Sequence, residues 1–178
     1  MPRLFGRRDE RPSDTGRGAG AGESAGRGES EAFDPALQVR PIGVVRNGVA
    51  RPRPDGWETV ESRLLIAPQH AAGLRGIEGF SHIIVLTWLH LAAHAREAMA
   101  IHPGGDARLP LTGVFALRVA GRPNPIGVTV VPLLRVVGTE LLVRGLDAVD
   151  GTPLLDLKPY LPPYDSVPGA LLPGWASG

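Results

Sequence analysis

Short runs of apolar residues alternate with polar, glycine-containing turns along most of the chain, which favours strands over long helices. The most apolar run, residues 81–91, predicts a central buried strand. Gly138 and Thr139 separate two long apolar runs and predict a two-residue type II′ hairpin. The other expected strands are 39–45, 62–66, 112–118, 128–137 and 140–146.

Helix is expected in only two places. Residues 92–101 are rich in alanine and are followed by Pro103, which makes them the best helix candidate. Residues 68–74 begin with a proline and predict one short helical turn. Residues 147–165 predict an irregular, nearly polyproline-like path. The expected fold class is mainly β, with six or seven short strands, one or two short helices and long loops, in a small antiparallel β-barrel or a sandwich.

Composition divides the chain into three regions. Residues 1–37 are dominated by Gly, Ser, Ala, Arg and Glu without an apolar period, so we expect a disordered tail. Residues 38–166 are expected to form the folded domain, and residues 167–178 a flexible C-terminal tail. Four alternate glycines from Gly16 to Gly22 mimic a dinucleotide-binding loop, but no strand precedes them and no apolar helix follows.

The overall composition is that of one globular domain, because 43% of the 178 residues are apolar and 21% are charged. The chain has no cysteine, which excludes disulfides, thiolate metal ligands and cysteine nucleophiles. It also lacks a membrane-length apolar stretch and a secretory signal, so we expect a cytoplasmic protein with no membrane partner. The net charge of +1 neither requires nor excludes a nucleic-acid partner.

The histidines give little support for a metal site. His90 and His94 have the spacing of a helical metal pair, but the residues between them lack the glutamate of a zinc-protease helix. His82, in the expected buried strand, is more typical of a hydrogen-bonded core residue. We therefore expect no metal. The nucleophile elbow, the phosphate-binding loop and the dinucleotide fingerprint are also missing, which argues against the classical methyltransferase and nucleotide folds.

Two proline-containing segments are the best candidates for a ligand site. Residues 122–127 read Arg-Pro-Asn-Pro-Ile-Gly, a rigid backbone that serves either as a plain turn or as a pre-organised ligand wall. Asp147 and Asp150 follow an expected strand, where two acids suit ribose hydroxyls or a cationic ligand. Asp150-Gly151 by itself is more typical of an ordinary turn.

Four blocks, in this order along the chain, resemble the TsaA-like (TrmO) family. They are Gly79-Phe80-Ser81-His82, Gly113-Val114-Phe115-Ala116, the Arg-Pro-Asn-Pro-Ile-Gly run and Leu146 to Tyr160. The resemblance spans about Pro41 to Asp165, and its last two blocks are the most specific. It implies a β-barrel methyltransferase that uses S-adenosylmethionine and works as a homodimer. The implied substrate is a threonylcarbamoyl-modified adenosine in the tRNA anticodon loop.

The resemblance also implies the site residues, although it names no catalytic acid or base. In-line methyl transfer depends mainly on alignment in a dry pocket, so none is required. The expected cofactor-binding residues are Arg53, Pro54, Asp55, His90, Leu91, Arg118, Val128, Asp147, Ala148, Val149 and Asp150. The expected substrate-binding residues are Arg122, Asn124, Lys158 and Tyr160.

The chain departs from the family pattern in three ways, which keeps other functions open. It reads Ala116-Leu117-Arg118-Val119 where the pattern is Ala-Thr-Arg-Ser, its early loop is shorter, and the C-terminal domain of longer members is missing. One alternative is a sensor or RNA-binding module that holds S-adenosylmethionine without turnover. Another is a methyltransferase for a small molecule or a different RNA. A metal-dependent hydrolase is a more distant alternative.

Overall fold

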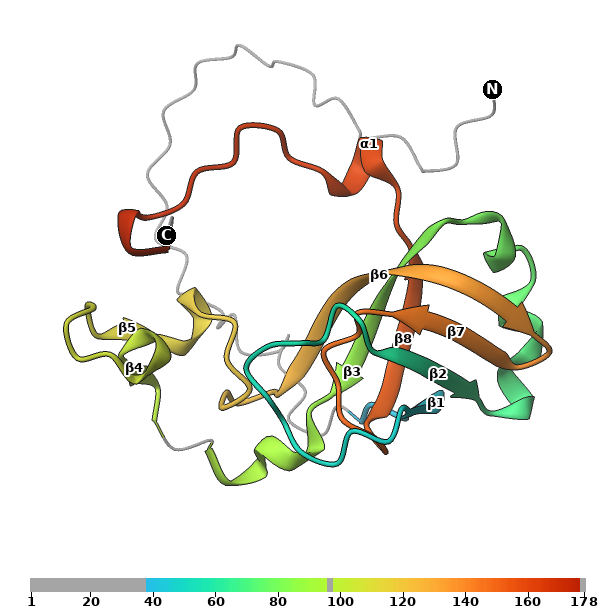
Figure 1. Ribbon diagram of the computed structural model, residues 1–178, viewed down its shortest axis with the longest axis horizontal. Coiled ribbons are helices and arrows are strands. Elements are labelled where there is room, and N and C mark those ends of the chain that lie inside the picture. Colours follow the sequence, from blue (N-terminus) through green and yellow to red (C-terminus); the bar gives the residue numbers. More distant parts are fainter. Residues whose placement is uncertain (1–37, 96–97, 177–178) are drawn as a thin grey trace, which may run out of the picture. The chain divides into compact units, whose positions relative to one another are not determined.

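The computed structural model describes residues 38–95 and 98–176. Residues 1–37 lie outside the described residues, so the disordered tail stays a prediction. Six strands form a closed barrel in the order β1, β2, β7, β6, β3, β8, and every neighbouring pair is antiparallel (Figure 1). This confirms the mainly β fold class and selects the barrel over the sandwich. The strands are β1 Gly43–Arg46, β2 Glu61–Ile66, β3 His82–Trp88, β6 Ile126–Val137, β7 Glu140–Arg144 and β8 Pro153–Pro159.

The barrel interior is aliphatic because alternate residues of each strand point inward. In β3, Ile83 and Val85 are fully buried and Thr87 is 2% exposed, while the residues between them are partly exposed. Burial of each such aliphatic side chain stabilises the fold by roughly 1.5–3 kcal/mol. The same core contains Val45, Leu64, Ile66, Leu74, Val131, Leu141, Val143, Leu146, Ala148 and Leu154.

Strand β6 pairs with two different strands along its length. Ile126 to Pro132 pair with β3, whereas Leu133 to Val137 pair with β7 after an irregularity in the register. Within the described residues, the first half of β6 therefore has one paired edge and one edge that no other strand covers. This open edge lies at the end of the barrel where β6 begins and β3 and β7 end.

The β6–β7 hairpin forms at the predicted position. Gly138 has a φ of +59°, and Thr139 has no positive φ, as the predicted turn with glycine in its first central position requires. The predicted helical turn after Ala67 is confirmed as the 3-10 helix Pro68–Leu74. Further 3-10 helices are Ile77–Gly79, His90–Ala95, Pro103–Gly105, Val114–Ala116 and Gly174–Ala176, and α1 is Pro162–Asp165.

Two predictions between β3 and β6 are wrong. Within the expected helix 92–101, residues 92–95 belong to the 3-10 helix His90–Ala95, residues 96–97 lie outside the described residues, and Ala100–Ile101 form a strand, β4. The expected strand 112–118 is strand only at Thr112–Gly113, β5, which pairs with β4. An alanine-rich stretch this short is marginal as a helix without a face to bury. The strand stops after two residues because its partner, β4, is itself only two residues long.

The region after β7 is also more regular than expected. Residues 153–159, predicted to be irregular, form β8, which closes the barrel between β1 and β3. Proline is accommodated because Pro153 and Pro159 occupy the first and last positions of the strand. The sequence prediction was wrong here because it took the prolines as a sign of irregular structure, whereas they stand at the two ends of a strand.

Candidate functional site

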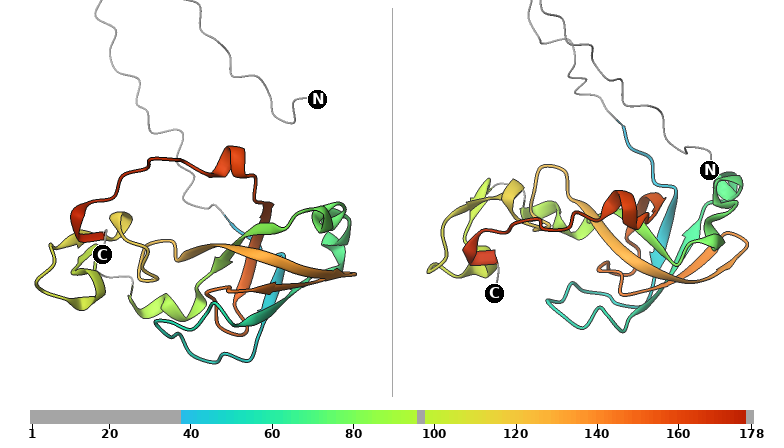
Figure 2. Two further views of the ribbon diagram at one scale, coloured as in Figure 1. Left: turned by 45° about the horizontal axis from the view of Figure 1, so that its top comes forward. Right: turned by 90° about the horizontal axis from the view of Figure 1, so that it is seen from above.

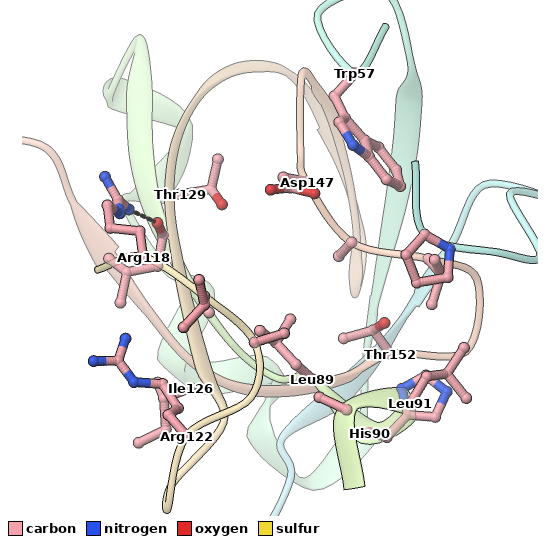
Figure 3. Close-up of a pocket in the computed structure, with 18 of the residues that line it drawn as sticks. Trp57, Leu89, His90, Leu91, Arg118, Arg122, Ile126, Thr129, Asp147 and Thr152 are labelled. Atoms are coloured by element: carbon pink, nitrogen blue, oxygen red, sulfur yellow. Dashed lines mark hydrogen bonds between the residues drawn. The ribbon is translucent and has the colours of Figure 1, made fainter. Parts of the chain in front are cut away.

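A pocket of about 740 Å³ lies at the end of the barrel beside the open edge of β6 (Figure 3). Its volume is in the range of small-molecule sites. Because neighbouring strands are antiparallel, the segments after β3 and β7 meet the start of β6 at this end. The lining residues are Pro52, Trp57, Leu89 to Ala92, Arg118 to Ala120, Arg122, Ile126 to Val130, Asp147 to Val149 and Thr152.

The pocket combines an apolar floor with opposite charges on its walls. Leu89 lies at the floor, Asp147 lies near Trp57, and Arg118 and Arg122 lie together on another side (Figure 3). Asp147 is exposed, and its carboxylate forms no hydrogen bond or ion pair with the described residues. It is the one carboxylate among the lining residues described. Such a wall suits a ligand that carries a cation or donor hydroxyls.

Both arginines of the pocket are bound to backbone oxygens only. Arg118 donates to the carbonyl of Val128 at 2.6 Å, and Arg122 donates to the carbonyl of Val114 at 3.3 Å. In the part of the chain that the structure describes, neither forms a salt bridge, whereas five salt bridges occur away from them. Two guanidinium charges without a carboxylate partner provide this side of the pocket with affinity for anions.

Trp57 forms a rigid wall because its own loop fixes it. Its indole N–H donates to the carbonyl of Arg53 at 3.0 Å, and the Arg53 guanidinium lies 4.9 Å from the ring centroid. Trp57 is only 9% exposed. The predicted residues Arg53, Pro54 and Asp55 do not line the pocket, so this loop reaches the pocket through Pro52 and Trp57, with Arg53 behind the ring.

Asp150 holds the same loop at its start. Its carboxylate accepts the backbone N–H groups of Asn47 and Gly48 at 2.8 and 3.1 Å and the Arg46 guanidinium at 3.1 Å. The two backbone donors, with Arg46 adding to their effect, lower the pKa of Asp150 below its ordinary value. Asp150 is absent from the pocket lining, although Asp147, Ala148 and Val149 belong to it.

Asn47 is a structural residue beside the pocket that the sequence reasoning missed. Its side-chain amide donates to the Ser62 hydroxyl at 3.0 Å and to the Ala148 carbonyl at 2.9 Å, and its oxygen accepts the N–H of Val49 at 3.0 Å. Ser62 is fully buried. Asn47 therefore fixes the β1–β2 loop and the β7–β8 loop to each other beside the pocket. A single asparagine after a short strand carries no sequence signal for this role.

His90 and Leu91 lie at the lower rim of the pocket, where the chain leaves β3 (Figure 3). The Nδ1 atom of His90 is buried and has no hydrogen-bond partner among the described residues. Buried polar atoms are usually satisfied, so this one marks a place where a bound molecule can supply the missing bond. Leu91 is 51% exposed and offers apolar surface at the same rim.

Three of the predicted substrate residues are not in the pocket. Asn124 contributes its carbonyl to the N–H of Ile126 and does not line the cavity. Lys158 is paired with Asp156 at 2.7 Å, a contact that raises the pKa of the lysine. Tyr160 packs edge-on against His82, with ring centroids 6.5 Å apart. Of the four predicted substrate residues, only Arg122 lines the pocket.

Several lining residues carried no sequence signal of their own. Leu89, Thr129 and Val130 belong to residues 81–91 and 128–137, which predict strands, and Thr152 belongs to residues 147–165, which predict an irregular path. Their position in the pocket follows from where the strands end, which the pattern does not define. The described residues contain no group of three or more His, Cys, Asp or Glu that can hold a metal ion. The side chain of His94 lies outside the described part of the chain.

A closed six-stranded barrel with a ligand-sized pocket at its strand ends defines a β-barrel protein of the small-molecule-binding class. The chain belongs to the TrmO family, because residues 46–166 match the family model described as the tRNA-methyltransferase O N-terminal domain. This confirms the resemblance seen in the sequence. No helix in the described part of the chain is long and apolar enough to span a membrane.

Relatives of two lengths are similar to the chain. A probable S-adenosyl-L-methionine-binding protein of Methanothermobacter thermautotrophicus is 41% identical over 75% of this chain and 97% of its own. The tRNA (adenine(37)-N6)-methyltransferase of Escherichia coli is 40% identical over 76% of this chain and 62% of its own. The crystal structure of TrmO from Pseudomonas aeruginosa superposes with a TM-score of 0.64 at 30% identity, covering 79% of this chain and 62% of that one. The chain thus spans less than two thirds of the two longer relatives.

Proposed function

We propose that this chain is a methyltransferase that uses S-adenosylmethionine to methylate an adenosine in the tRNA anticodon loop. The proposed acceptor is the exocyclic amide nitrogen of a threonylcarbamoyl-modified adenosine. The observation that carries the proposal is the convergence of separate segments on one pocket. Seven of the eleven expected cofactor residues line it, namely His90, Leu91, Arg118, Val128, Asp147, Ala148 and Val149.

The residues present fit S-adenosylmethionine. The unpaired Asp147 carboxylate suits the ammonium, sulfonium or ribose hydroxyls of this ligand, and the orphaned Nδ1 of His90 offers a further polar contact. Leu89, Ile126 and Val149 provide an apolar surface for its adenine. When bound, S-adenosylmethionine supplies an electrophilic methyl group on a sulfonium.

The chain's own residues would align the reactants and exclude water, which is most of what methyl transfer requires. Trp57 walls one side and is fixed by its loop, and the open edge of β6 offers backbone donors and acceptors beside Val128. Arg118 and Arg122, which lack carboxylate partners among the described residues, provide positive charge for RNA phosphates. Transfer of the methyl group would replace the N–H proton of the acceptor nitrogen, and that proton would pass to solvent, so the mechanism assigns no described residue as a base.

We also propose that the chain works as a homodimer in the cytoplasm, where its proposed tRNA substrate occurs, without a metal or membrane partner. Exposed apolar side chains outside the pocket support the dimer, because Leu134 and Val137 in the second half of β6 are 39% and 60% exposed. Exposed apolar residues that gather on one strand are typical of protein interfaces. Sedimentation of the full chain tests the proposed dimer.

A second function is favoured by the relatives of similar length, which are named as S-adenosyl-L-methionine-binding proteins. In that function the chain binds the cofactor without transferring its methyl group. The decisive experiment incubates the purified chain with methyl-labelled S-adenosylmethionine and two anticodon stem-loops, one with threonylcarbamoyladenosine and one with adenosine. If the chain is the proposed enzyme, label enters the modified stem-loop alone. Cofactor binding without label in either RNA would establish the second function.

A further inference from the structure

We propose that Trp57 binds the adenine ring of S-adenosylmethionine by stacking its indole on that ring. The inference deepens the proposed function, on which it rests, because it assigns one part of the cofactor to one wall of the pocket. Trp57 belongs to the early loop, where the chain departs from the family pattern, so the family motifs give this residue no role.

Trp57 is buried without belonging to the aliphatic core of the barrel. It is 9% exposed, yet it is not among the residues that form the core cluster of the described chain. Its ring is instead part of the pocket wall, on the side that also carries Asp147 (Figure 3). A large aromatic ring gains most from contact with apolar or aromatic surface. The ring of Trp57 therefore offers its remaining surface to whatever occupies the pocket.

The loop holds the ring in place before any ligand arrives. The indole N–H donates to the carbonyl of Arg53 at 3.0 Å, and the Trp57 carbonyl accepts the N–H of Val60 at 2.9 Å. The Arg53 guanidinium lies over the ring and also donates to the carbonyl of Gly56. A ring fixed in this way loses little conformational freedom when a ligand stacks on it.

Arg53 decides which part of the cofactor suits this ring. An aromatic face attracts either a cation, such as the sulfonium, or a flat neutral ring, such as adenine. The Arg53 guanidinium already lies 4.9 Å from the ring centroid. A sulfonium on the opposite face would be repelled by this charge, because like charges raise the energy of each other's placement. A neutral purine meets no such repulsion, so the adenine is the favoured occupant.

The charges around the pocket favour the adenine of the cofactor over that of the RNA. In the cofactor the adenine is bonded to a ribose with free hydroxyls, which can donate to the unpaired carboxylate of Asp147 beside Trp57. The target nucleotide of an RNA instead carries a phosphate on each side of its ribose, which Asp147 would repel. Arg118 and Arg122, which attract phosphates, lie on another side of the pocket (Figure 3).

Calorimetric titration with two ligands tests the stacking. S-adenosylhomocysteine has the adenine of S-adenosylmethionine but no sulfonium charge. We expect Trp57→Leu to weaken both ligands by the same factor, about tenfold or more, and Trp57→Phe to stay within about threefold of the natural chain. The matched control is Trp175→Leu, in the segment that leaves the barrel after α1 (Figures 1 and 2), and it should not change either affinity.

Three results of this titration would overturn the inference. Unchanged affinity in Trp57→Leu would remove Trp57 from the ligand contact. A much larger loss for S-adenosylmethionine than for S-adenosylhomocysteine would place the sulfonium on the ring. An equal loss in Trp57→Phe and Trp57→Leu would show that the loop structure, and not the aromatic face, matters. Unaltered cofactor affinity with a raised KM for the modified stem-loop would assign the ring to the target adenosine instead.

Tryptophan fluorescence gives a readout that a purely structural role of Trp57 would not change, and it needs no leucine variant that folds. A purine stacked on an indole quenches its emission. Titration with S-adenosylhomocysteine should therefore lower the emission of the natural chain and of Trp175→Leu, and should hardly change that of Trp57→Phe. An equal decrease in Trp57→Phe would overturn the stacking.

The binding and fluorescence titrations contain no RNA, so they separate this inference from the proposed methyl transfer. A natural chain that binds the cofactor through Trp57 but methylates no stem-loop would overturn the proposed enzyme and leave the stacking intact. Methylation of the modified stem-loop with unchanged cofactor affinity in Trp57→Leu would do the reverse. A folded natural chain that binds neither ligand would overturn both.

Discussion

The carboxylate of Asp150 accepts the backbone N–H of Asn47 at 2.8 Å and thereby joins two loops that are 103 positions apart in the chain. The side chain of Asn47 makes a second hydrogen bond between the same two loops, because its amide donates to the carbonyl of Ala148 in the loop that contains Asp150. Trp57 comes from the first loop and Asp147 from the second, and both line the pocket. This reciprocal contact is therefore the structural element that sets two pocket walls relative to each other.

Asp150→Ala should weaken both the fold and the cofactor site, although Asp150 does not line the pocket. The change leaves the N–H groups of Asn47 and Gly48 without their charged acceptor, at an expected cost of about 1–2 kcal/mol in the free energy of unfolding. Urea denaturation measures that cost, and calorimetric titration measures affinity. The matched control is Glu61→Ala, whose exposed pair with Arg144 predicts a change below about 1 kcal/mol. Equal losses in both variants would contradict the role of Asp150.

The lowered pKa of Asp150 predicts loss of stability in acid. The folded state holds this carboxylate charged to a lower pH than the unfolded state does, so its contribution is complete above the unfolded value, about pH 4, and disappears as the pH falls through the folded pKa. The stability difference between the natural chain and Asp150→Asn should therefore be constant from about pH 7 to about pH 5 and shrink below about pH 4. Urea titrations at each pH measure it. A stability difference between the two chains that increases as the pH falls would contradict a lowered pKa of Asp150.

Asp147→Asn should reduce S-adenosylmethionine affinity without unfolding the barrel. Asp147 is exposed and has no partner among the described residues, so the loss of its charge leaves nothing in the fold unpaired. A tenfold or greater loss of affinity, about 1.4 kcal/mol, is expected by calorimetry. Thermal unfolding should change little. Unaltered affinity would remove Asp147 from the site.

Gly127→Ala should destabilise the barrel beside the pocket. A Cβ at this position would lie 2.5 Å from the Thr87 hydroxyl oxygen and 3.1 Å from a methyl carbon of Leu89. Thr87 is 2% exposed and cannot move freely, so the expected cost is about 1–3 kcal/mol. The control, Gly113→Ala, has its nearest such neighbour at 3.9 Å and should change stability by less than about 0.5 kcal/mol. Similar stability of the two variants in urea would contradict the close packing of Gly127.

The sequence could predict the barrel because its strands carry their own signals. Apolar runs located β2, β3, β6 and β7, and Gly138 located the hairpin between the last two. It failed for β8, where Pro153 and Pro159 mark the ends of a strand that is held by its neighbours β1 and β3. It failed again for residues 92–101, where alanine content indicates helix but no apolar stripe gives a helix a face to bury.

The candidate site could be predicted only where a motif marks it. The family motifs indicated Asp147, Arg118 and His90, which the fold brings together. They also indicated Asp150, whose carboxylate instead binds the N–H groups of another loop. That distinction is a matter of side-chain direction, which spacing does not encode. Leu89 directly follows β3 and Thr152 directly precedes β8, so both enter the pocket because of where these strands end and begin.

Calorimetric titration of the purified full chain with S-adenosylmethionine tests the central claim most directly. We predict one cofactor bound per chain in the natural protein and much weaker binding in Asp147→Asn. Absence of binding by a folded natural chain would contradict the assignment of the pocket as the cofactor site, and with it the proposed methyl transfer.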